Sequence, residues 1–90
     1  MNTESIPARQ VEPAALQLPG DFCFDEDFSH LYLILPGTKH PDSIAIQRGT
    51  LGGPRAWGWD GNVERPTLQP SIHMPGEWHG YLRAGQLESC

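Results

Sequence analysis

Ser71 and His79, which lie eight residues apart near the C-terminal end of the chain, carry the two side chains that acyl transfer needs. A serine hydroxyl is a weak nucleophile near neutral pH until an imidazole takes its proton. Asp60, Glu64 and Glu77 are each available to orient the imidazole, and no spacing rule selects one of them. The sequence therefore predicts Ser71 and His79 as a catalytic pair. The alternative is that Ser71 caps a turn and His79 is a half-buried strand residue, because the chain has no G-x-S-x-G nucleophile elbow.

Two prolines restrict the backbone around the predicted nucleophile. Pro70 precedes Ser71, and Pro75 follows four residues later. A proline limits the conformations that the unfolded chain can adopt, so less freedom is lost when the segment is fixed. We therefore expect an irregular but well-ordered segment that preorganises Ser71.

A metal site is the second kind of chemistry that the sequence offers. Neutral imidazole and thiolate groups suit zinc, and His73, His79 and Cys90 supply them, with His40 in reserve. The spacing of these residues matches no compact zinc motif, and the two cysteines, Cys23 and Cys90, form no C-x-x-C pair. We therefore predict no cofactor and two unlinked thiols, with zinc as the open alternative.

Trp57, Trp59 and Trp78 form a third notable set, and we predict them, with His73, as residues that bind a partner. Exposed aromatic side chains at the rim of a small domain anchor partners or stack on ligands. The alternative is that the core needs these large side chains, in which case at least two of the three tryptophans are structural.

Alternating apolar residues and turn signals indicate the elements that carry these side chains. Asp60-Gly61-Asn62 is a strong turn signal, so residues 63–72 should run back beside residues 55–59. Pro66 and Pro70 lack backbone donors, which favours an edge strand, a bulge or an irregular crossing instead of a central strand. The other expected strands contain Phe22 and Phe24, residues 31–35, Ile44 and Ile46, and the two arms of a hairpin around Ala84-Gly85.

About six short strands result, and ten glycines with nine prolines leave little room for helix. We therefore predict an all-β fold, a small antiparallel sandwich or flattened barrel, in a single β-rich domain over residues 21–90. Residues 1–20 contain Pro7, Pro13 and Pro19 and are predicted to form an extended arm, with a possible helical turn at residues 13–16.

Charge and hydropathy exclude several classes of function. The 90 residues carry a formal charge of -5, and the six basic side chains are scattered, so nucleic-acid binding is not expected. The longest apolar run, residues 31–35, is far shorter than a membrane span, and the polar start lacks the features of a signal peptide. We expect a cytoplasmic protein that does not bind membranes.

From Trp57 onward the chain resembles a family of small bacterial and phage proteins known as a domain of unknown function. The shared pattern is W-x-W-[ND]-G, then P-T-x-x-P-S-[IL], then a histidine before an aromatic or leucine-containing strand and a glycine turn. The matching residues, over roughly the last 35, are Trp57, Trp59, Asp60, Gly61, Pro66, Thr67, Pro70, Ser71, Ile72, His79, Gly85 and Cys90. Longer members look like peptidases that process the modifier of bacterial ubiquitin-like systems. Many relatives carry cysteines where this chain has residues 35–38, which puts a family metal ligand at that loop in doubt.

Two hypotheses about function follow. The first is a small phage or bacterial accessory protein that acts by binding another protein, on the scaffold of a peptidase-like family. The alternative is a serine-type or metal-assisted peptidase that processes a ubiquitin-like modifier, with Ser71 and His79 as its catalytic residues. Pairing through an exposed strand edge would allow a homodimer in either case.

Overall fold

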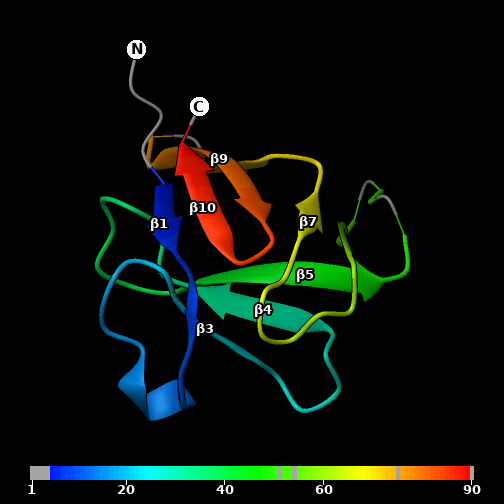
Figure 1. The fold of residues 1–90 in the computed structure, drawn as a ribbon, viewed down its shortest axis with the longest axis horizontal. Helices are drawn as coiled ribbons and strands as arrows, with labels where there is room; N and C mark the ends of the chain where they lie inside the picture. The colour runs from blue at the N-terminus through cyan, green and yellow to red at the C-terminus, as the bar shows by residue number, and fades with distance from the viewer. Residues whose placement is uncertain (1–4, 51, 54, 75, 90) are drawn as a thin grey trace.

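The computed structural model describes residues 5–50, 52–53, 55–74 and 76–89, which form two β-sheets around one core (Figure 1). The predicted all-β fold is confirmed. The described residues form ten strands where about six were expected, because several strands have only two or three residues. The strands are β1 (Ser5–Pro7), β2 (Arg9–Gln10), β3 (Asp21–Phe24), β4 (His30–Leu33), β5 (Asp42–Arg48), β6 (Trp57–Trp59), β7 (Leu68–Gln69), β8 (Ile72–Met74), β9 (Trp78–Arg83) and β10 (Gln86–Ser89).

The smaller sheet contains four antiparallel strands in the order β1-β10-β9-β8. Strands β9 and β10 form the predicted hairpin, in which Arg83 pairs with Gln86 across a two-residue turn. Ala84 and Gly85 both have positive φ angles, of 48° and 76°, as a type I′ hairpin turn requires. Strand β9 also pairs with β8, so the outward-facing side chains of these two strands lie side by side.

The larger sheet has six strands in the order β2-β3-β4-β5-β6-β7. The predicted return of the chain after the Asp60-Gly61-Asn62 turn is confirmed, since Trp59 pairs with Leu68 in antiparallel register. Strand β7 lies at the edge of the sheet, as the neighbouring prolines indicate. Two pairs, β2 with β3 and β5 with β6, are parallel, so the sheet is mixed and not purely antiparallel.

The segment predicted as an extended arm joins both sheets. Its residues Ser5–Pro7 pair with β10 in the smaller sheet, and Arg9–Gln10 pair with β3 in the larger one. A short 3-10 helix follows at Pro13–Ala15, in the region where a helical turn was expected. The described part of the chain contains no helix with the length and apolar character to cross a membrane.

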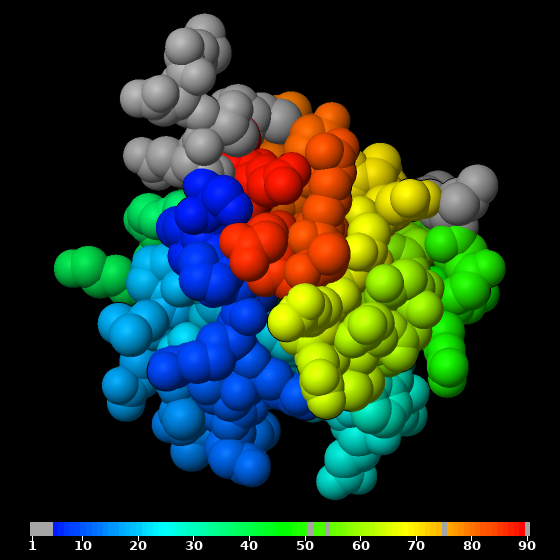
Figure 2. All heavy atoms as spheres, in the orientation of Figure 1, coloured from blue at the N-terminus to red at the C-terminus, as the bar shows by residue number. Residues whose placement is uncertain are grey.

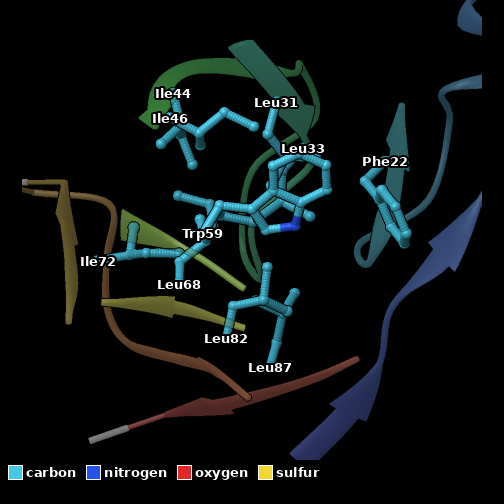
Figure 3. Close-up of a cluster of buried hydrophobic side chains, with 11 residues drawn as sticks. Phe22, Leu31, Leu33, Ile44, Ile46, Trp59, Leu68, Ile72, Leu82 and Leu87 are labelled. Carbon is cyan, nitrogen blue, oxygen red and sulfur yellow. The ribbon is translucent and has the colours of Figure 1, made fainter. Parts of the chain in front are cut away.

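The core lies between the two sheets, and Figure 3 shows side chains from both of them gathered around the indole of Trp59. The cluster takes alternate residues from each strand, as the two-residue period of a half-buried sheet predicts. Its members are Phe22, Leu31, Leu33, Leu35, Ile44, Ile46, Trp59, Leu68, Ile72, Leu82 and Leu87. Ile72 and Leu82 point into this core, so their neighbours in sequence point to the outside of the smaller sheet.

One buried carboxylate fixes the chain between the arm and β3. Asp21 exposes only 2% of its surface and accepts hydrogen bonds from the backbone amides of Gln17 and Leu18, at 3.1 and 3.0 Å. Arg9 donates to the same side chain at 3.2 Å. Burial opposes ionisation, but these three donors together lower the pKa of Asp21 below its ordinary value. The ionised carboxylate therefore ties the arm to the larger sheet.

Candidate active site

Ser71 and His79 lie on the outer face of the smaller sheet. Ser71 directly precedes β8, and His73 of β8 pairs with His79 of β9. Because side chains alternate between the two faces of a strand, Ser71, His73, His79 and Tyr81 share one face, while the residues between them face the core. Figure 2 shows β9 and β10, in orange and red, on the surface of the molecule beside the yellow segment that contains β7.

The two predicted catalytic side chains are in contact. His79 Nε2 lies 3.2 Å from Ser71 Oγ, a distance within the range for a nucleophile and its base. In the tautomer that carries its hydrogen on Nδ1, His79 accepts a hydrogen bond from the Ser71 hydroxyl. His79 is exposed and Ser71 is half-buried, so both side chains are open to a substrate. The structure thus brings the pair together, and their catalytic roles stay a prediction.

The backbone of Ser71 is held by a tryptophan of the other sheet. Trp57 Nε1 donates a hydrogen bond to the Ser71 carbonyl oxygen at 3.1 Å. Trp57 belongs to β6 and is half-buried against the core, so this bond links the larger sheet to the start of β8. The bond fixes the position from which the Ser71 hydroxyl projects.

The imidazole of His79 has another imidazole as its neighbour. The ring centroids of His73 and His79 are 4.7 Å apart, with 41° between the ring planes. Among the residues that the structure describes, no hydrogen bond or ion pair joins His79 to a carboxylate. The three candidate acids lie elsewhere. Asp60 accepts a hydrogen bond from the backbone amide of Asn62, and Glu77 Oε1 lies 3.7 Å from His40 Nε2. Glu64 is exposed in the loop before β7.

A second serine, histidine and aspartate group lies at the turn between β3 and β4, and the sequence did not suggest it. Ser29 Oγ donates to Asp25 Oδ2 at 2.8 Å, and His30 Nδ1 lies 3.2 Å from the same oxygen. The serine and the aspartate both face Nδ1 of His30, so the ring cannot pass a proton between them through its two nitrogens.

The role of that second group is structural. Asp25 also accepts the backbone amides of Ser29 and His30, at 2.8 and 3.0 Å. Burial opposes its ionisation, but the Ser29 hydroxyl and these amides lower the pKa of Asp25 from 3.8 to about 2. The carboxylate organises the turn, and we do not assign it a catalytic role.

The predicted binding residues have different surroundings. Trp59 exposes only 3% of its surface and donates its indole N–H to the Asn62 carbonyl, so its burial argues against a role as an anchor for a partner. Trp57 and Trp78 are half-buried and pack against the core, and Trp78 Nε1 donates to Ser89 Oγ at 2.9 Å. His73 is exposed. At least for Trp59, the structural alternative is therefore the better interpretation.

The histidines suggested for zinc separate into two places. His73 and His79 lie together, whereas His40 lies with Asp42 and Glu77, where one ligand atom of each residue falls within 4.8 Å of the others. Among the described residues, His40, Asp42 and Glu77 are the set whose spacing could hold a metal ion. Cys90 lies outside the described residues. Cys23 is a buried free thiol, and burial and the charges of Asp25 and Glu12 raise its pKa.

One feature near Ser71 was missed from the sequence. A hollow of about 300 Å³ reaches Pro70, the residue before Ser71, and is lined by Thr67, Leu68, Gln69, Pro70, Tyr81 and Arg83. The guanidinium of Arg83 lies over the Tyr81 ring, 4.0 Å from its centroid, and donates to Glu88 at 3.3 Å. The two-residue period from His79 places Tyr81 and Arg83 on its face, so the alternation of β9 was the available signal.

The comparisons with known proteins extend the similarity well beyond the last 35 residues. Residues 8–90 match the model of a family described as "Bacterial ubiquitination-like system serine protease (BubE)". Searches of curated proteins and of solved structures found no matching relative.

Proposed function

Because the chain belongs to the BubE family of serine proteases of bacterial ubiquitination-like systems, we propose that it is a serine-type peptidase that cleaves the tail of a ubiquitin-like modifier. The family favours this function over that of an accessory protein that only binds. The observation that carries the proposal is the 3.2 Å contact between His79 Nε2 and Ser71 Oγ on an open face of the sheet.

Acylation is the first step of the proposed reaction. As Ser71 Oγ attacks the carbonyl carbon of the scissile peptide bond, His79 Nε2 takes the hydroxyl proton. The resulting tetrahedral intermediate collapses when the C–N bond breaks, and His79 gives its proton to the leaving nitrogen. The products are a free amine and an ester between the modifier tail and Ser71.

Deacylation uses the same two side chains. A water molecule attacks the ester carbonyl while His79 Nε2 takes one of its protons. The bond between the carbonyl carbon and Ser71 Oγ then breaks, and His79 returns the proton to Ser71. The modifier tail leaves as a carboxylate, so the two steps together consume one water molecule.

His73 is proposed as a positioning residue for His79. Its ring packs at 4.7 Å beside the His79 ring and limits the orientations that the imidazole can adopt. Among the described residues no hydrogen bond or ion pair joins His79 to a carboxylate, so we assign the orientation of its ring to this packing and to the bond with Ser71. We expect a weaker general base than a carboxylate-oriented histidine would be.

Cleavage of a modifier fusion tests the proposal. The wild-type protein should remove a C-terminal extension from a ubiquitin-like protein of a bacterial ubiquitination-like system, as detected by intact-mass spectrometry. Ser71→Ala should abolish the cleavage. Ser43→Ala is a matched control, because Ser43 is an exposed serine of β5 on the other sheet, and it should cleave normally. Cleavage by the Ser71→Ala protein would contradict the proposal.

Protein binding is a second candidate function, because an apolar surface lies apart from Ser71. Phe28 is 44% exposed and stacks on Trp59, with ring centroids 5.7 Å apart. Phe28 and Val63 line a hollow of about 440 Å³. Exposed aromatic side chains of this kind often anchor a protein partner. If binding is a function, Phe28→Ser should weaken capture of the modifier by the Ser71→Ala protein, and unchanged capture would remove this candidate.

A further inference from the structure

The hollow beside Ser71 has a defined direction relative to the catalytic pair. Ile72 pairs with Gly80, so Ser71 lies opposite Tyr81 on the adjacent strand. His79 and Arg83 flank Tyr81 on the same face of β9, each about 7 Å from it along the strand. The hollow occupies the Tyr81 and Arg83 side, between β9 and residues 67–70.

The chemistry of acyl transfer assigns the two sides to different parts of a substrate. His79 must give its proton to the leaving nitrogen, so the leaving group lies on the His79 side of Ser71. The acyl part of the substrate then extends away from His79, past Tyr81 and toward Arg83. A side chain on the acyl side of the scissile bond can therefore enter the hollow.

Arg83 is the one charged side chain among the residues that line the hollow. Its side chain is 56% exposed, and the guanidinium lies 4.0 Å from the centroid of the Tyr81 ring. A planar guanidinium offers two parallel N–H groups to a carboxylate. The remaining lining residues supply hydroxyl, amide and apolar groups, none of which repels an anion.

We infer that Arg83 forms a subsite for an acidic side chain on the acyl side of the scissile bond. The inference rests on the proposed function, since it uses Ser71 and His79 as the reacting pair. Glu88 competes for the guanidinium through one hydrogen bond of 3.3 Å, but an exposed ion pair of this kind is weak. A substrate carboxylate can displace it, and Glu88 therefore limits the preference for acidic substrates.

Two activated esters test the inference. The p-nitrophenyl esters of N-blocked glutamate and N-blocked glutamine have side chains of similar shape and differ in charge. The rate of p-nitrophenolate release gives kcat/KM for each ester. The assay should contain about 0.15 M salt, because the chain carries a net charge of -5 and would repel an anionic ester at low ionic strength.

The wild-type protein should hydrolyse the glutamate ester with a kcat/KM about tenfold higher than that of the glutamine ester, a difference of about 1.4 kcal/mol. Arg83→Gln should bring the ratio to about one, and Glu88→Gln should raise it above the wild-type value. The ratio is measured within each variant, so a general loss of activity cancels. Arg55→Gln, which removes an equal charge from the loop before β6, should keep the wild-type ratio.

A wild-type ratio of one or less, or a ratio that persists in Arg83→Gln, would overturn the inference. A fluorophosphonate probe separates this failure from failure of the proposed function. If the probe labels Ser71 and the esters show no preference, the Arg83 subsite is wrong and the peptidase proposal stands. If the probe leaves Ser71 unlabelled, the proposed function fails and the subsite fails with it.

Discussion

The hydrogen bond from Trp57 to the Ser71 carbonyl predicts a specific effect of the Trp57→Phe substitution. Phenylalanine keeps most of the apolar packing of the half-buried indole but loses the Nε1 donor. The Ser71 carbonyl would then lack the contact that ties it to β6. We expect both a less stable protein and a less well-positioned nucleophile.

The magnitudes follow from the loss of one hydrogen bond at a partly buried site. Leaving such an acceptor unpaired costs about 1–3 kcal/mol, and we expect a value near 1.5 kcal/mol because Ser71 retains some access to water. If a similar energy is lost in holding Ser71 for attack, the rate of reaction falls about tenfold. A matched control is Trp59→Phe, which removes an indole bond of equal length, 3.1 Å, to the Asn62 carbonyl.

Two measurements on each variant separate stability from reactivity. Urea unfolding followed by circular dichroism gives the free energy of unfolding, and the rate of fluorophosphonate labelling without urea gives the reactivity of Ser71. Both variants should be destabilised, Trp59→Phe at least as much because its ring is in the core. Only Trp57→Phe should label about tenfold more slowly. Equal labelling rates for the wild-type protein and Trp57→Phe would refute the reasoning.

Three further predictions concern stability. The pKa values of Asp21 and Asp25 are lowered in the folded protein, so their contribution to stability is present above the ordinary carboxyl pKa of about 4 and is lost as the pH falls through the folded-state pKa values, which for Asp25 is about 2. Acid titration by circular dichroism should show this loss, and Asp21→Asn should weaken it. Ala84→Asn should raise the free energy of unfolding, measured by urea titration, by about 0.5–1 kcal/mol, because asparagine tolerates a φ of 48° better than alanine does. A free energy of unfolding below that of the wild-type protein would contradict the turn assignment. Gly80→Ala should destabilise the protein by about 2–3 kcal/mol in urea unfolding, because the added carbon would meet the Glu88 carbonyl oxygen and the Trp78 ring. An unchanged midpoint of the urea transition would show that the hairpin can shift.

The local parts of the fold could be predicted from the sequence because short-range signals determine them. Asp60-Gly61-Asn62 and Ala84-Gly85 each close a pair of neighbouring strands, and both pairings are present. The prolines around β7 correctly indicated an edge. The pairing of Ser5–Pro7 with β10 could not be predicted, because it joins the two ends of the chain and depends on contacts far apart in sequence.

The candidate site was predictable in its residue types and not in its surroundings. Serine and histidine in a stiff segment suggested acyl transfer, but the 3.2 Å contact depends on the register of β8 against β9. A one-residue change of register would have turned His79 into the core. The hollow was missed because residues 67–70 meet β9 only in the folded chain, although the alternation along β9 could have placed Arg83 on the face of His79. The dependence on tertiary contacts also explains why no acid could be selected for His79.

Labelling of Ser71 by a fluorophosphonate probe, measured by intact-mass and peptide mass spectrometry, is the most direct test of the proposed nucleophile and base. The wild-type protein should gain one adduct on Ser71, and Ser71→Ala should gain none. His79→Ala should label about 100-fold more slowly, the low end of the range for general-base catalysis, because no described carboxylate orients the imidazole. An adduct on another serine, or an unchanged rate in His79→Ala, would contradict the assignment of Ser71 and His79 as the reacting pair.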